Sequence, residues 1–165
     1  MTATGRPVRL RTIFRTLALV LALATASAGP AIAAPPDISP ALDHVGIQAA
    51  DLGRSIDFYT RVLGLKEVPA PFPKTEARWV AFANGQLLHI VAHGRAASTH
   101  NKWDHFAVAF TDLTPVIARL DAMHVAWADM SGGRLPQKRP DGVTQIFVQD
   151  PDGYQIELND AGARR

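Results

Sequence analysis

The sequence predicts an α+β fold made of two copies of one module, each a strand, a helix and three further strands. Segment 43–47 (Asp-His-Val-Gly-Ile) reappears 61 residues later as segment 104–108 (Asp-His-Phe-Ala-Val), and an Asp-Leu pair follows each copy at the same distance. An Asn-Gly pair and an Asp-Gly pair later in the chain also occupy matching places. Self-similarity at a fixed spacing indicates a repeated structural unit. We therefore expect two modules, at about 41–95 and 103–160, within one domain at 41–160.

Each module is expected to open with a strand and a helix. Alternating apolar residues predict the strands, and these residues are Leu42, Val45 and Ile47 in one module and Phe106, Val108 and Phe110 in the other. Asp51 suits the N-cap of the first helix, and Gly64 suits its end. The apolar face between them recurs at helical spacing and consists of Leu52, Ile56, Tyr59 and Leu63.

The second helix is expected to start near residue 113. Either Asp112 or Thr114 can cap it, and Pro115 fits its first turn, where the missing backbone N–H has no partner to lose. Its apolar face consists of Leu113, Val116, Leu120 and Met123. His124 stands where a glycine stop is expected, and histidine tolerates the left-handed backbone conformation better than most residues.

Three strand-like runs follow each helix. They cover 65–68, 78–83 and 86–92 in the first module, and 125–128, 143–148 and 154–158 in the second. The Asn-Gly pair at 84–85 and the Asp-Gly pair at 152–153 predict tight hairpins between the last two strands of each module. Segments 70–77 and 129–142, rich in Pro, Gly and basic residues, are expected to be the longest loops.

Residues 1–33 are identified as a secretory signal peptide. Four arginines and no acidic residue precede a short apolar run, and the small-residue segment after it contains Ala-Ile-Ala at 31–33. These are the three parts of an export signal; cleavage is expected after Ala33, with Ala-Ser-Ala at 26–28 as second choice. The alternative, a membrane anchor, needs about 20 apolar residues, and this run is much shorter. We expect a periplasmic or secreted protein without stable membrane association, whose Pro-rich lead-in at 34–40 cannot be helical.

The charge of the remaining chain argues against nucleic-acid binding. The sequence has 17 Lys and Arg against 15 Asp and Glu. Four of the arginines lie in the signal segment, which leaves 13 basic against 15 acidic residues. No basic stripe of the kind that phosphate backbones require is left. The sequence also has no cysteine, which excludes a lipid-modified lipoprotein and disulfides, so an ordinary hydrophobic core must stabilise the domain.

Four residues at matched places of the repeat form a candidate metal site. His44 and His105 lie on the opening strands, and His89 and Glu157 lie on the closing strands. Three imidazoles and one carboxylate suit a divalent cation such as Zn, Ni, Fe, Mn or Co. If the two modules pack with pseudo-two-fold symmetry, both pairs can converge on one cation. The alternative for each histidine is a hydrogen-bonded structural residue of a strand.

Two arginines are the candidates for binding substrate. Arg78 lies at the start of a predicted strand, and Arg139 lies in the long loop at 129–142, next to Lys138. Guanidinium groups at the border of a cavity can hold an anionic group of a substrate. The alternative for each of them is a solvated surface charge.

The remaining candidate polar residues are expected to lie outside the site. His93 is four residues beyond His89 and shares its strand face, so it could be an accessory ligand, but a position in solvent at the strand end is favoured. His100 lies in the linker between the modules and is expected to be exposed. Asp43 and Asp104 directly precede the ligand histidines and should therefore face away from the site.

Two segments resemble the vicinal oxygen chelate superfamily, which includes glyoxalases, fosfomycin-resistance proteins and extradiol dioxygenases. The first, 42–65, begins with Leu-Asp-His-Val-Gly-Ile and ends with Val-Leu-Gly-Leu, and the second, 150–158, reads Asp-Pro-Asp-Gly-Tyr-Gln-Ile-Glu-Leu. The resemblance covers about residues 40–160. It implies paired βαβββ modules that form a curved mixed sheet around a divalent metal. It also implies a homodimer, because members of this length often build a site from modules of two chains; whether the site here lies within one chain or is shared stays open. The implied ligands are His44, His89, His105 and Glu157.

The resemblance favours a metal-dependent lyase- or isomerase-type enzyme that acts on a small oxygenated substrate. The metal would polarise a carbonyl and stabilise an enediolate, and Glu157 would shuttle the proton as the base. Bacterial glyoxalase I carries a carboxylate where this sequence has His89, and export separates the chain from the mainly cytosolic thiol glutathione. Both features weigh against lactoylglutathione lyase activity. The alternatives are a protein that sequesters a ligand or antibiotic without chemistry, and fosfomycin-type addition of thiol or water to an epoxide.

Overall fold

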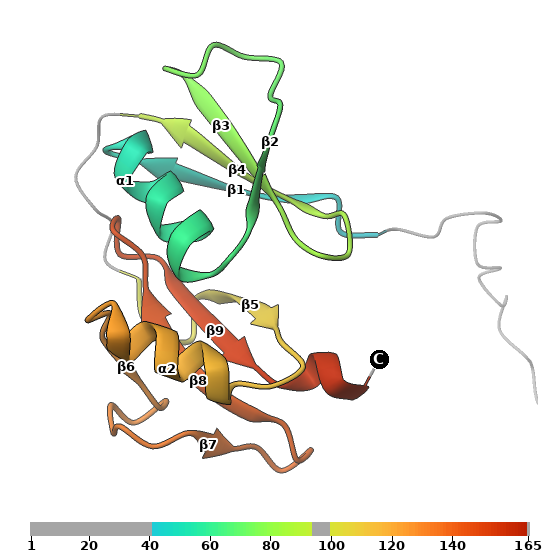
Figure 1. The fold of residues 1–165 in the computed structure, drawn as a ribbon, viewed down its shortest axis with the longest axis vertical. Helices are drawn as coiled ribbons and strands as arrows, with labels where there is room; N and C mark the ends of the chain where they lie inside the picture. Colours follow the sequence, from blue (N-terminus) through green and yellow to red (C-terminus); the bar gives the residue numbers. More distant parts are fainter. Residues whose placement is uncertain (1–40, 94–99, 165) are drawn as a thin grey trace, which may run out of the picture. The chain divides into compact units, whose positions relative to one another are not determined.

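The first module is a four-stranded mixed sheet with one helix across a face (Figure 1). The computed structural model describes residues 41–93 and 100–164, so the predicted signal segment and lead-in, at 1–33 and 34–40, lie outside the described residues. The strands run in the order β1-β4-β3-β2, with β1 parallel to β4 and the other pairs antiparallel. The elements are β1 (His44–Ala49), α1 (Leu52–Asp57), the π-helical turn η1 (Phe58–Val62), β2 (Lys66–Val68), β3 (Ala77–Ala81) and β4 (Leu87–Ala92).

The second module repeats this arrangement, which confirms the predicted α+β fold of two βαβββ modules. Its main sheet has the order β5-β9-β8-β6, and β5 is parallel to β9 as β1 is to β4. The elements are β5 (His105–Ala109), α2 (Thr114–Ala122), β6 (Trp127–Ala128), β7 (Gln137–Lys138), β8 (Thr144–Gln149), β9 (Gln155–Asn159) and the short helix η2 (Ala161–Arg164). Strand β7 lies in the segment predicted to be a loop, because its Gln-Lys sequence has no apolar alternation and only its pairing with β8 defines it. No helix of the described part of the chain is long and apolar enough to cross a membrane.

The first helix begins as the sequence predicts but changes its winding. The Asp51 side chain accepts a hydrogen bond from the Arg54 backbone N–H at 3.0 Å, which confirms the N-cap. Gly64 follows the helix with a φ of 77°, a left-handed conformation that glycine adopts without strain. The π-helical turn between these points was not predicted. There the Thr60 hydroxyl donates to the Ile56 carbonyl at 2.7 Å, and side-chain bonds of this kind compete with regular helical pairing.

The second helix differs from the prediction at both ends. Leu113 occupies the N-cap position without a side-chain bond, although Asp112 still accepts from the Thr114 N–H at 2.8 Å. Met123, expected on the buried face, is 37% exposed because the helix ends at Ala122 and Met123 lies just beyond it. His124 has a φ of 55°, which confirms the predicted left-handed stop.

The turn at 150–153 ties the second module to the first helix. Tyr59 donates its hydroxyl to the Asp150 carboxylate at 2.7 Å, and Ser55 donates to the Asp152 carboxylate at 2.8 Å. All four side chains are buried, and one apolar cluster, which includes Ile90 and residues of β8 and β9, continues from one module into the other. Burial raises the pKa of Asp150 above its usual range, and the Tyr59 hydroxyl opposes that rise by stabilising the charged form.

Replacing Tyr59 with Phe is expected to destabilise the fold by about 1–3 kcal/mol, because a buried carboxylate loses its side-chain donor. The loss should be largest near pH 7 and shrink as the pH falls through the raised pKa of Asp150, where the protonated carboxyl needs the donor less. Urea unfolding at several pH values measures it. Tyr154→Phe is the matched control, since that hydroxyl accepts only from the Gln48 backbone N–H at an exposed site. Equal losses in both variants would contradict the role given to Asp150.

Candidate metal centre

The two predicted ligands of the first module lie against each other in a ring stack. His44 is the first residue of β1, and His89 lies on the neighbouring strand β4. Their ring centroids are 4.0 Å apart and their planes differ by 16°. On the other side of His89, Trp79 of β3 stacks with a centroid distance of 4.0 Å and an angle of 7°. Cross-strand register explains the second contact, because Trp79 is the direct partner of His89.

Each histidine of this pair has one ring nitrogen, its Nε2, without a hydrogen bond to the described residues. His44 Nδ1 lies 2.7 Å from Asp43 Oδ2, and a carboxylate can only accept, so the free Nε2 carries the lone pair. Asp43 was expected to face away, and instead it orients the ring. His89 Nε2 is buried and has no hydrogen-bond partner among the described residues. Burial, and secondarily the neighbouring His44, lower the pKa of His89, which favours the neutral, metal-binding form of the ring.

The two predicted ligands of the second module also face each other. Glu157 lies in the middle of β9 and is 5% exposed. Its Oε2 lies 3.3 Å from Nε2 of His105, the first residue of β5. His105 Nδ1 lies 2.6 Å from the Lys102 carbonyl oxygen, which can only accept, so Nδ1 carries a proton and Nε2 is the ring nitrogen that faces Glu157. A carboxylate oxygen and an imidazole nitrogen at this separation can both ligate one cation, so the pair fits a divalent metal ion.

The second oxygen of Glu157 is held by protein donors. Oε1 accepts from Asn159 Nδ2 at 2.7 Å and from Arg139 Nη1 at 3.1 Å. Arg139 also pairs with Asp141. Arg139 therefore contacts the candidate ligand Glu157 and does not stand at an open border where it could hold a substrate. Asn159 was not among the predicted site residues, although it lies two residues beyond Glu157 and so on the same strand face.

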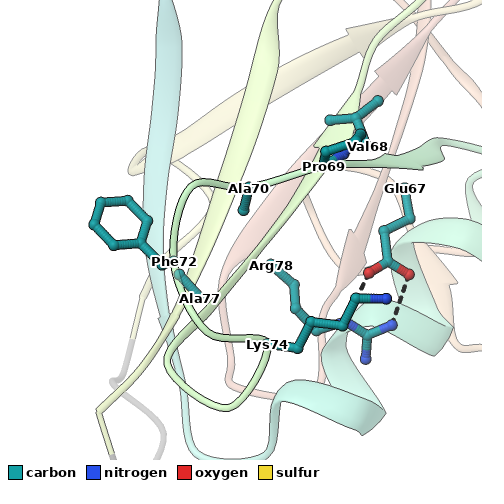
Figure 2. A pocket seen from close by; sticks show the side chains of 8 residues that line it. All are labelled: Glu67, Val68, Pro69, Ala70, Phe72, Lys74, Ala77 and Arg78. Carbon is teal, nitrogen blue, oxygen red and sulfur yellow. Dashed lines mark hydrogen bonds and ion pairs between the residues drawn. The ribbon is translucent and has the colours of Figure 1, made fainter.

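Arg78 lies on the opposite face of the first sheet from His89. It pairs in register with Ile90, one residue beyond His89, and successive strand residues point to opposite faces. Its guanidinium forms two hydrogen bonds to Glu67, at 2.9 and 2.6 Å. The pair, together with Lys74, borders a cavity of about 430 Å³ (Figure 2). The predicted substrate-binding arginine of this module is thus not brought to the face that carries the histidines.

Of the two histidines expected to lie in solvent, His93 does and His100 does not. His93 is exposed just beyond the end of β4, as favoured. His100 was expected to be exposed, but its side chain is only 21% exposed because the ring stacks on Tyr154 with a centroid distance of 4.5 Å. Its Nδ1 lies 2.8 Å from Asp104 Oδ2, so Asp104 serves His100 and not His105.

The two pairs of candidate ligands, His44 with His89 and His105 with Glu157, lie apart from each other. Within residues 41–93 and 100–164, no group of three or more His, Asp or Glu side chains lies close enough to hold one metal ion. The sequence left open whether both pairs converge on one cation inside a single chain. In the described residues they do not converge. Each module instead carries two of the four candidate donors.

Known proteins share this architecture and sequence. The model of the Glyoxalase/Bleomycin resistance protein/Dioxygenase superfamily matches residues 41–158. A probable lactoylglutathione lyase of Vibrio cholerae is 30% identical over 125 residues, covering 70% of this chain and 86% of that protein. The solved structure of a putative glyoxalase family protein from Bacillus anthracis is 24% identical with a TM-score of 0.60, covering 74% and 96% of the two chains.

A fosfomycin resistance protein, FosX, of Listeria monocytogenes has the same fold, with a TM-score of 0.60, 17% identity, and coverage of 74% of this chain and 92% of that one. The family model spans both modules and includes all four candidate ligands, from His44 to Glu157. The chain therefore belongs to the Glyoxalase/Bleomycin resistance protein/Dioxygenase superfamily.

Proposed function

We propose that this protein is an exported, metal-dependent enzyme of lyase or isomerase type that acts on a small oxygenated substrate. The observation that carries the proposal is the Glu157–His105 pair, in which a carboxylate oxygen and a ring nitrogen face each other at 3.3 Å. The buried, unpartnered Nε2 of His89 supports it from the other module. Similarity to proteins named lactoylglutathione lyase supports the lyase class.

The complete centre in this proposal forms between two chains of a homodimer. Each chain supplies one half site from each module, and a half site with two donors falls short of the three or four protein ligands usual for zinc-like ions. The face of the first sheet that bears His44 and His89 also carries Val91, which is 39% exposed. A second chain placed against this face would cover Val91 and bring a Glu157–His105 pair to the histidines. Closed two-fold dimers are the commonest assemblies of soluble proteins.

The residues of the chain have distinct tasks in this centre. A divalent cation held by these residues would supply Lewis acidity to stabilise negative charge on the substrate oxygens. Neutral histidines hold the cation, and Asp43 and the Lys102 carbonyl fix the tautomers of His44 and His105. Glu157 serves as the base that moves a proton, and it does so through Oε2, because Asn159 and Arg139 occupy Oε1. Arg139 already serves two carboxylates, which favours a role in holding Glu157 over one in binding substrate.

Metal analysis of the exported protein tests the proposal. Protein from the periplasmic fraction of expressing cells, where the mature chain is expected to begin at Ala34, should retain about one divalent ion per chain after gel filtration, one for each shared site. Intact mass measurement fixes the start of the chain, and elemental analysis by plasma mass spectrometry identifies the ion. Reconstitution of stripped protein with Zn²⁺, Ni²⁺ or Co²⁺ completes the measurement.

A chain that holds no stoichiometric metal after reconstitution would contradict the ligand assignment and favour the sequestering protein. Stoichiometric metal with conversion of an epoxide in the presence of thiol or water would favour the fosfomycin-type reaction instead of the lyase. A substrate screen on the reconstituted protein separates these reactions.

A further inference from the structure

The two oxygens of the Glu157 carboxylate have different surroundings, and this difference has a consequence for how Glu157 binds a cation. Oε2 faces His105 Nε2, whereas Oε1 accepts two hydrogen bonds, from Asn159 and from Arg139. We propose that Asn159 and Arg139 are positioning residues that keep Oε1 occupied, so that Glu157 binds a divalent cation through Oε2 alone. The inference rests on the proposed metal centre and adds the mode of ligation and two residues that set it.

Asn159 is fixed so that it can only donate to Glu157. Its side chain is buried, and its Oδ1 accepts from the Ala161 backbone N–H at 3.1 Å. The amide nitrogen must therefore be the atom that meets Oε1, at 2.7 Å. Because Asn159 and Glu157 are alternate residues of β9, the strand itself places the donor beside the carboxylate.

A tight turn of the backbone fixes the position of Arg139. The backbone N–H of Arg139 donates to the Val143 carbonyl at 2.7 Å, and Gly142 closes the turn with a φ of 83°. The guanidinium Nε and Nη2 bond to the Asp141 carboxylate, so Nη1 is left for Glu157. Arg164 of η2 donates to the Asp141 carbonyl at 2.6 Å and supports the same turn.

These bonds make ligation through both oxygens costly. A carboxylate that binds a cation with both oxygens has to turn its Oε1 lone pairs toward the ion, and the two bonds to Asn159 and Arg139 would weaken or break. A hydrogen bond to a charged group contributes about 1.5–3 kcal/mol. Outer-shell partners of this kind orient the ligand and raise metal affinity.

The test compares three variants of the full mature protein loaded with Co²⁺, whose visible absorption responds to the number of ligands. Asn159→Ala should weaken Co²⁺ binding by about 10–100-fold, as loss of an outer-shell partner does, and should change the Co²⁺ spectrum. Arg139→Ala should change the spectrum in the same direction, because Oε1 loses one of the two donors that keep it from the ion. The Co²⁺ affinity of the Arg139→Ala variant is a poorer measure. Loss of a positive charge near the cation raises the affinity, whereas loss of positioning lowers it.

Arg134→Ala is the matched control, because this substitution also removes one positive charge from segment 129–142. The Arg134 side chain pairs with Asp121 and not with Glu157. The substitution should leave affinity within about twofold and the spectrum unchanged, as expected of a surface ion pair. If Asn159→Ala fails to fold, Arg139→Ala carries the test through the spectrum, since its side chain is 36% exposed. Wild-type binding with identical spectra in all variants overturns this inference alone. Wild-type protein that binds no Co²⁺ overturns the proposed metal centre and this inference with it.

Discussion

A mixture of the His44→Ala and His105→Ala variants is expected to bind a divalent cation that neither variant binds well by itself. Each substitution removes a ligand, so each pure variant should lose more than the roughly 10–100-fold in affinity that an outer-shell change costs. His44 belongs to the half site of the first module and His105 to that of the second. If each complete site joins the first module of one chain to the second module of its partner, a mixed dimer contains one intact site and one site that lacks both histidines.

The size of the recovery follows from random pairing. When the two variants are mixed in equal amounts and allowed to exchange, about half of the dimers are mixed, and about a quarter of all sites are intact. Titration with Zn²⁺ against a chromophoric chelator should therefore show about a quarter of the wild-type sites at wild-type affinity. The pure variants, taken through the same exchange step, are the controls.

Recovery is decisive because the alternative arrangement gives none. A site built within one chain lacks one histidine in every chain of the mixture, whatever its partner. A mixture that shows no sites of wild-type affinity, although sedimentation or native mass spectrometry detects mixed dimers, would therefore exclude the shared site. Protein that remains monomeric while the wild type binds metal would exclude it as well.

Local chemistry is the part of the structure that the sequence predicted well. The Asp51 cap, the left-handed Gly64 and His124, and the hairpin glycines each depend on residues within a few positions of one another. The duplication extended these local signals to the fold, because a module recognised twice has the same order of elements twice.

Features that depend on strand register or on contacts across the chain could not be predicted. Arg78 and His89 lie on opposite faces of one sheet, and this follows only from the pairing of β3 with β4. The contact of Arg139 with Glu157 requires the turn at 139–143 and the strand β7, which has no apolar pattern. His100 is covered because the chain brings Tyr154 beside it, 54 positions later in the numbering. The structure places the candidate ligands together two by two within each module, but no sequence signal says whether one chain or two complete the centre.

Replacing Glu157 with Gln is expected to abolish turnover while the fold is kept. The amide oxygen of Gln can still accept from Asn159 and Arg139, as Oε1 does now. The amide nitrogen then takes the place of Oε2 and points a donor at the His105 Nε2 lone pair, which lies 3.3 Å from that position. The variant thus satisfies every hydrogen bond around the site, so its thermal unfolding should stay close to that of the wild type. Turnover falls because the variant has no base, which alone costs about 100–10,000-fold, and because His105 now spends its lone pair on the amide instead of the cation.

The matched change is Glu67→Gln, which also turns a paired carboxylate into its isosteric amide but affects only Arg78, on the opposite face of the first sheet from His89. For any small oxygenated carbonyl compound that the wild type converts, the Glu67 variant should retain activity within a few-fold while the Glu157 variant loses it. Metal content separates the two causes of that loss. A Glu157→Gln protein that keeps its cation and loses turnover has lost the base, whereas one that loses both has lost a ligand first. Unchanged turnover in the Glu157 variant would remove Glu157 from the mechanism, because no other carboxylate of the described chain faces His105 at contact distance.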